Sequence, residues 1–183
     1  WQPVSAGLPA TTALALAADA TGRVYVGFDA AGLYIQGPDQ SGWKSLPLAA
    51  AAILSLAVSA DGRYIYAGTA GQGVWTSQDF GASWVNTYPD QYVSNIALNP
   101  IRPTLAVASL RDRLARTLAG GQSWHTLPLP WAREEITALL WLRDGSLGAA
   151  TGQGRLYRSL DNGDTWVEGG AGLPAGRAVL ALA

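Results

Sequence analysis

Five residues in one stretch of the chain combine cationic and aromatic side chains that could bind an anion or a sugar. They are Arg111, Arg113, Arg116, Trp131 and Arg133. Guanidinium groups donate paired hydrogen bonds to carboxylate or phosphate, and together with an aromatic ring they also suit sugar recognition. The same stretch carries Asp112, Glu134 and Glu135, whose charges nearly balance those of the arginines. A solvated rim of ion pairs is therefore the alternative interpretation, and the one we favour.

Other site chemistry finds little support. The chain has no cysteine and a single histidine, His125, so a transition-metal site is not expected. The run Asp161-Asn162-Gly163-Asp164 lacks the ligand spacing of a calcium loop, so we interpret it as a structural turn. We predict no metal and no cofactor. With 12 basic and 13 acidic residues and no basic stripe, we expect no nucleic-acid partner.

Composition indicates a folded chain rich in tight turns. Hydrophobic residues make up 49% of the sequence and charged residues 14%, which excludes a disordered chain. The 22 glycines suit turns, and the 8 tryptophans suit large packing anchors. No apolar run reaches the ~20 residues that a membrane span needs.

The elements that must position these residues follow from a repeat. Tryptophans recur about every 40 residues, at Trp1, Trp43, Trp84, Trp124 and Trp166. After each tryptophan comes an apolar segment, and these segments predict first strands at Ala13–Ala18, Ile53–Ser59, Val93–Asn99 and Ile136–Leu142. Asp-Gly pairs at Asp61-Gly62 and Asp144-Gly145 predict tight hairpins in which both turn residues have positive φ.

Four short, locally connected strands in each repeat predict small antiparallel sheets that must stack to bury their faces. We therefore expect an all-β fold of β-propeller blades, and a superhelical β-solenoid is the alternative. The expected blades cover residues 3–43, 44–84, 85–124 and 125–166. Residues 167–183 would begin a fifth blade. Four complete blades and part of a fifth indicate a segment of a larger propeller, or a homo-oligomer that completes the ring.

Two turns share the pattern Ser-x-Asp-x-Gly-x-Ser/Thr-Trp, and we call them box turns. One contains Ser77, Asp79, Gly81 and Trp84, and the other Ser159, Asp161, Gly163 and Trp166. A third turn, residues 117–124, has Ala119 in place of the aspartate. The pattern resembles the Asp-box, or bacterial neuraminidase repeat, of sialidase, sortilin and photosystem II assembly-factor-like propellers. The resemblance implies a structural role for these eight residues and favours a secreted or periplasmic location.

For function we expect a non-catalytic scaffold propeller that binds a protein partner or a carbohydrate. The alternative is a segment of a sialidase-like or xyloglucanase-like glycoside hydrolase, because both kinds of enzyme use this repeat. We assign no catalytic residue. Residue types that sialidases use are present, as arginines, Tyr92, Glu134 and Asp90, but no motif of the family identifies any of them as catalytic. A third hypothesis is an excised fragment without a function of its own.

Overall fold

The computed structural model describes residues 5–39, 41–48, 52–89, 91–131 and 134–169. These residues form four antiparallel sheets of four strands, and each sheet is connected in chain order. The first sheet contains β1 (Ala13–Ala18), β2 (Val24–Phe28), β3 (Leu33–Gln36) and β4 (Trp43–Ser45). The second contains β5 (Ile53–Val58), β6 (Ile65–Thr69), β7 (Val74–Ser77) and β8 (Val85–Tyr88).

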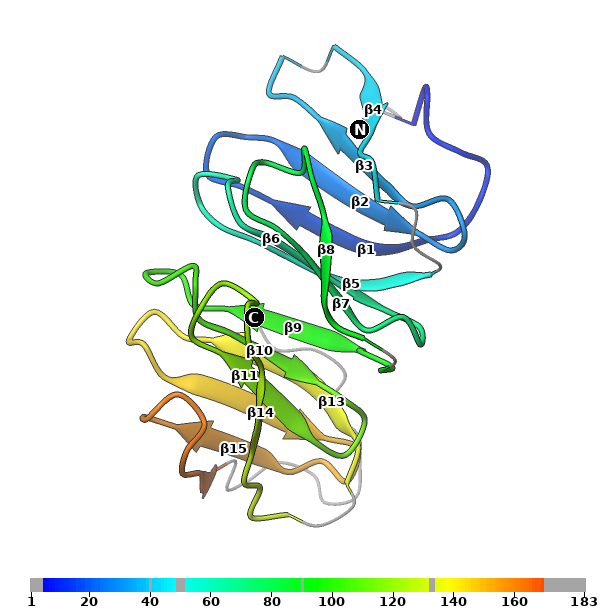
Figure 1. Ribbon diagram of the computed structural model, residues 1–183. Coiled ribbons are helices and arrows are strands. Elements are labelled where there is room, and N and C mark those ends of the chain that lie inside the picture. The colour runs from blue at the N-terminus through cyan, green and yellow to red at the C-terminus, as the bar shows by residue number, and fades with distance from the viewer. Residues whose placement is uncertain (1–4, 40, 49–51, 90, 132–133, 170–183) are drawn as a thin grey trace.

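The third sheet contains β9 (Asn95–Leu98), β10 (Ala106–Ser109), β11 (Leu114–Thr117) and β12 (His125–Leu127). The fourth contains β13 (Ile136–Trp141), β14 (Leu147–Thr151), β15 (Leu156–Ser159) and β16 (Val167–Gly169). Figure 1 shows the four sheets following one another from the blue end of the chain to the orange end. The predicted all-β fold is confirmed, and the expected first strands agree with β1, β5, β9 and β13 to within two residues.

The tryptophans lie at the start of the last strand of each sheet and not at its end. Trp43 is the first residue of β4, and Trp84, Trp124 and Trp166 immediately precede β8, β12 and β16. Each sheet therefore extends a few residues beyond the tryptophan at which the repeats were divided. Residues 170–183, which include most of the expected fifth blade, lie outside the described residues.

Three apolar cores lie between successive sheets. The first, centred on Tyr25, Ile53 and Ile65, joins sheets one and two. The second, around Tyr66 and Val93, joins sheets two and three, and the third joins sheets three and four. Each sheet buries one or both faces against a neighbouring sheet, which is the packing that a small two-faced sheet requires.

The first strands of the four sheets pack against one another in succession, β1 on β5, β5 on β9 and β9 on β13. Polar bonds join them: the Ile96 amide donates to Oγ of Ser55 at 2.8 Å, and the Trp141 indole donates to the Ala97 carbonyl at 3.2 Å. On the first sheet Leu16 points away from the second sheet and is 72% exposed. The arrangement is that of part of a β-propeller.

The Asp-Gly turns differ from the expected two-residue type. Gly62 and Gly145 have φ of 77° and 83°, whereas Asp61 and Asp144 do not have positive φ. The Asp61 carboxylate instead accepts hydrogen bonds from the Arg63 amide and the Ser59 hydroxyl. The prediction of two positive φ values was wrong because an aspartate side chain can cap a longer turn from an ordinary backbone conformation.

Candidate functional site: a polar groove beside β8

The arginines expected to form a rim lie in different places. Arg111 and Arg113 belong to the link between β10 and β11, and the Arg111 guanidinium lies 5.2 Å from the centre of the Tyr92 ring. Arg113 contacts Asp112 at 3.8 Å, and both side chains are more than half exposed. This link therefore carries a solvated pair of cations in which Arg111 has an aromatic neighbour.

Arg116 lies farther along β11 and contacts the fourth sheet. Its Nη1 is 2.9 Å from Oδ1 of Asp164 and donates to the Asn162 carbonyl at 3.0 Å. Its side chain is only 15% exposed. Arg116 thus fills the space between the third and fourth sheets and does not join Arg111 and Arg113.

Trp131 is a core residue. It is 4% exposed, its ring stacks on Tyr157 with a centroid distance of 4.1 Å, and Trp166 packs edge-on at 5.4 Å. The indole therefore offers no open face to a ligand. Arg133, the remaining residue of the expected cluster, lies outside the described residues.

The box turn of the second sheet is closed by its own side chains. Ser77 accepts a hydrogen bond from the Gly81 amide at 2.8 Å, and Asp79 accepts from the amide and the hydroxyl of Ser83 at 2.9 and 2.6 Å. The Trp84 indole donates to the Gly81 carbonyl at 3.1 Å. The hydroxyl and amide of Ser83, followed by the Ser77 hydroxyl, hold the pKa of Asp79 below its ordinary value.

The box turn of the fourth sheet repeats this geometry. Ser159 accepts from the Gly163 amide at 2.7 Å, and Asp161 accepts from the amide and hydroxyl of Thr165 at 2.8 and 2.6 Å. These bonds from Thr165, with a smaller contribution from Ser159, lower the pKa of Asp161 to about 2. The Trp166 indole donates to the Gly163 carbonyl at 3.0 Å.

The third turn departs from this pattern in two ways. Thr117 still accepts from the Gly121 amide at 2.9 Å, but Ala119 offers no side-chain acceptor to the turn. The Trp124 indole does not bond to its own turn and donates across the sheet boundary to Oγ1 of Thr87 at 3.2 Å. The third turn is therefore tied to the second sheet.

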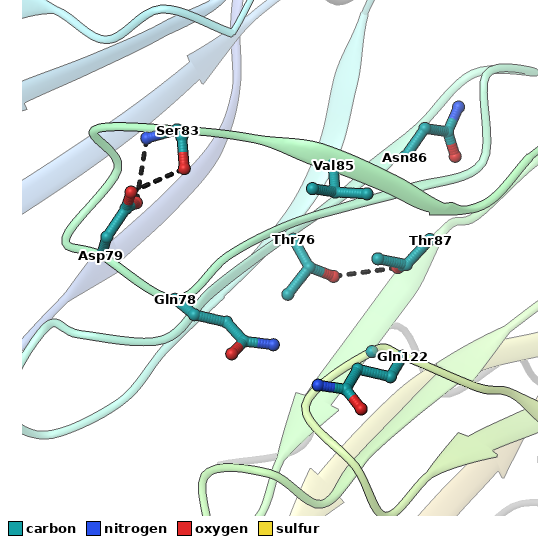
Figure 2. A pocket seen from close by; sticks show the side chains of 9 residues that line it. Thr76, Gln78, Asp79, Ser83, Val85, Asn86, Thr87 and Gln122 are labelled. Carbon is teal, nitrogen blue, oxygen red and sulfur yellow. Dashed lines mark hydrogen bonds between the residues drawn. The ribbon is translucent and has the colours of Figure 1, made fainter.

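A polar groove lies at this departure, and we call it the β8 groove. It has a volume of about 570 Å³, and its lining residues are Thr76, Gln78, Asp79, Ser83, Val85, Asn86, Thr87, Gly121 and Gln122. Figure 2 shows Thr87 and Thr76 on the side of β8 that faces Gln122 of the third box turn, and Asn86 on the other side of the strand. The second sheet and the third box turn thus form opposite walls.

The groove exists because two space-filling residues are missing at this junction. The third residue of the third strand is Ile35 in the first sheet and Arg116 in the third, but the smaller Thr76 in the second. The third residue after the tryptophan is Leu46 or Leu127 in those sheets, but Thr87 here. Thr76 and Thr87 hydrogen bond to each other at 3.0 Å.

Apolar leucines elsewhere cover the glycine of the next box turn. A Cβ on Gly81 would lie 2.8 Å from Leu46 Cδ1, and one on Gly163 would lie 2.6 Å from Leu127 Cδ1. At the β8 groove the corresponding neighbour is polar: a Cβ on Gly121 would lie 2.7 Å from the Thr76 hydroxyl oxygen. Polar groups thus replace apolar ones at one junction of the repeat.

The sequence interpretation missed this groove. Its signals were present as the loss of the aspartate at Ala119 and the change from leucine to threonine at Thr87. Neither signal shows, without the structure, that the two residues lie at one junction. Within the described part of the chain no group of three or more His, Asp or Glu side chains could hold a metal ion. No helix there is long and apolar enough to cross a membrane.

Comparison with solved structures supports the fold at low sequence identity. An ancestral GH74 enzyme matches with a TM-score of 0.72 and 19% identity over 91% of this chain and 25% of its own. The β-propeller domain of Cps50 (Swd1) from Myceliophteria thermophila matches with a TM-score of 0.67 and 20% identity, over 82% of this chain and 52% of its own. The WD40 repeats of RRP9 match with a TM-score of 0.72 and 13% identity, over 87% of this chain and 51% of their own.

The chain thus spans about a quarter of the GH74 enzyme and about half of the two propellers. No protein-family model matches the sequence, and no curated protein matches it. The structural neighbours are β-propellers, and they include both enzymes and WD40 repeats.

Proposed function

We propose that the chain is part of a non-catalytic binding propeller of the Asp-box type, with the β8 groove as its ligand site. The observation that carries this proposal is that two departures from the repeat, Thr76 and Thr87, line one polar groove. The opposite wall is the third box turn, in which Ala119 is a further departure. Repeats agree where packing dictates the residue, and a local departure that opens a cavity is the expected mark of a functional site.

The carboxylates support a binding role. Among the described aspartates with a clear shift, the pKa is lowered in every case, as at Asp61, Asp79, Asp144 and Asp161. Hydrogen bonds within the aspartates' own turns are the main cause in these four. A glycosidase of the two-carboxylate type requires an acid whose pKa is raised. These aspartates are therefore suited to closing turns and not to donating protons.

The Arg111–Arg113 link remains a second proposed contact surface. Its cations are exposed, and Arg111 lies over the Tyr92 ring. The exposed Leu16 face of the first sheet fits a further blade, from the same protein or from a second copy. Both features are compatible with a scaffold that assembles with a protein partner.

One observation favours the alternative of a glycoside hydrolase segment. The Glu134 side chain is 13% exposed, its Oε1 lies 3.5 Å from Nη1 of Arg155, and its Oε2 is buried without a hydrogen-bond partner in the described part of the chain. A largely buried carboxylate in the link between two sheets could serve as an acid or a base.

The test is hydrolysis of sialyllactose and xyloglucan by the wild type and by Glu134→Gln. We expect no turnover above the enzyme-free background for either protein. Turnover by the wild type that disappears in Glu134→Gln would overturn the non-catalytic assignment. Equal circular dichroism spectra of the two proteins are the control for folding.

A further inference from the structure

The β8 groove follows the open edge of a sheet. β8 is the last strand of the second sheet, and in the described part of the chain no strand pairs with its outer side. Three consecutive residues of β8, Val85, Asn86 and Thr87, line the groove. Successive side chains of a strand point to opposite faces, so a groove lined by consecutive residues runs along the main-chain edge. An open edge is a template for another strand.

The lining provides neutral hydrogen-bonding groups. The carboxamides of Gln78, Gln122 and Asn86 and the hydroxyls of Thr76 and Thr87 dominate it. Oδ1 of Asn86 is buried without a partner in the described part of the chain, while its Nδ2 donates to the Gln72 carbonyl at 2.9 Å. An acceptor of this kind requires a donor from a ligand or from water.

Among the described lining residues the one carboxylate belongs to Asp79, and it already accepts hydrogen bonds from Ser83. No arginine or lysine is among the described residues that line the groove, so these residues offer no counter-ion to an anionic ligand. No aromatic ring among the described residues lines it either, so a stacking platform for a sugar is missing. Backbone amides and small polar side chains match the lining best.

The corresponding edge in the third sheet is blocked. Beside β12 the space is filled by Arg116, which pairs with Asp164, and by Leu127. Beside β4 the equivalent residues are Ile35 and Leu46, which pack against the first core. Of these three edges, that of β8 borders the polar groove, and the described neighbours of the other two fill the corresponding space.

We propose that the β8 groove binds an extended, uncharged polar segment of a partner protein, which adds to the edge of β8 as a fifth strand. This inference rests on the proposed binding function and names the chemical class of its ligand. Main-chain hydrogen bonds to β8 provide affinity. The Gln78 and Asn86 amide nitrogens already donate to the Gly120 and Gln72 carbonyls, so the Gln122 carboxamide is the main side-chain group that selects for small polar side chains.

The first experiment selects peptides from a random phage-displayed library on the wild-type chain. Counter-selection uses Thr76→Arg/Gln122→Asp, which copies the Arg116–Asp164 pair of the next junction into the groove. We expect enrichment of uncharged peptides rich in Ser, Thr, Asn and Gln that bind this variant about tenfold or more weakly. If selection yields no enriched sequence, or peptides that bind both proteins equally, the proposal is overturned.

A second variant that fills the groove is needed in case the double variant does not fold. Gln122→Trp places a bulky ring at an exposed turn position and should weaken the selected peptide by a similar factor. The matched pair Asn86→Ala and Thr126→Ala alters equivalent positions of β8 and β12. We expect only Asn86→Ala to weaken binding, and equal effects of the two would contradict a site at β8.

Hydrogen exchange measured by NMR provides the specific signature of strand addition. Amide protons of Val85–Tyr88 should exchange more slowly when the selected peptide is bound, and those of β12 should not change. A xyloglucan oligosaccharide serves as the competing ligand, and slower β8 exchange with the sugar but not with any peptide would overturn the proposal. If no peptide binds and no substrate is hydrolysed, the strand-addition proposal is wrong but the proposed non-catalytic function is not contradicted. Hydrolysis of either substrate would contradict both the strand-addition proposal and the non-catalytic function.

Discussion

Trp124 donates its indole N–H to Oγ1 of Thr87 across the boundary between the second and third sheets. The indoles of Trp84 and Trp166 bond instead to glycine carbonyls of their own turns. The repeat tryptophan therefore closes its own turn in the second and fourth sheets, whereas in the third sheet it connects that sheet to the second.

Thr87→Val should lower the free energy of unfolding by about 1–2 kcal/mol, because it removes the acceptor of the partly buried Trp124 indole and leaves that donor unpaired. Urea denaturation followed by tryptophan fluorescence measures the change. Thr126→Val, at an exposed position of β12, is the control and should alter stability little. An equal loss in both variants would show that the Trp124–Thr87 bond contributes nothing specific.

Restoring the missing aspartate should stabilise the third turn. In Ala119→Asp the new carboxylate can accept from the amide and hydroxyl of Ser123, as Asp79 does from Ser83. We expect the melting temperature to rise by ~1–4 °C, the effect of a net hydrogen bond in a domain of this size. Differential scanning calorimetry measures it, with Ala119→Asn as a shape-matched comparison. A fall in melting temperature would mean that the third turn cannot adopt the geometry of the other two.

The Asp161 carboxylate should make stability depend on acid pH. Its pKa is about 2 in the folded chain against an ordinary value of 3.8, so the unfolded chain binds more protons as the pH falls. The contribution of Asp161 is complete above pH 3.8 and is lost as the pH falls through about 2. The stability difference between wild type and Asp161→Asn should therefore shrink over this interval in urea titrations.

The control for that titration is Asp112→Asn, which changes an exposed carboxylate whose only ion-pair contact in the described part of the chain is a 3.8 Å approach to Arg113. A difference between wild type and Asp161→Asn that stays constant from neutral pH to pH 2 would contradict the assigned cause.

Arg116→Ala should open a second groove between the third and fourth sheets. The loss of its packed side chain and of its bond to the Asn162 carbonyl should lower the unfolding free energy by about 1–2 kcal/mol. Asp164→Asn keeps that carbonyl bond and removes only a half-exposed partner, so it should cost less than about 1 kcal/mol. Comparison by urea denaturation separates packing from charge, and equal losses would assign the effect to the ion pair.

Trp131→Ala should act on stability and not on recognition. The buried ring stacks on Tyr157, so its truncation should cost about 3–5 kcal/mol. Affinity for a peptide selected on the β8 groove should be unchanged under conditions where the variant remains folded. Weaker binding by a folded Trp131→Ala protein would indicate that this aromatic residue contributes to the ligand site.

The sequence by itself determined the repeat. Tryptophans at regular intervals and short apolar segments between turn residues are local features, and they were sufficient to predict four-stranded antiparallel sheets and the first strand of each. The serine, aspartate and glycine of the box turns likewise act within a few residues of one another, so their pattern can be seen in the chain.

The contacts between sheets were decided only by the tertiary structure. Arg116 and Trp131 lie close to Arg111 in sequence, yet one binds the turn at Asp164 and the other enters a core. Thr76 and Thr87 belong to a different repeat from the third box turn with Ala119, yet these two threonines and that turn form the walls of a single groove. Such contacts depend on how one sheet is placed against the next, and a repeat pattern fixes the interval between sheets without fixing which side chains meet across their boundary.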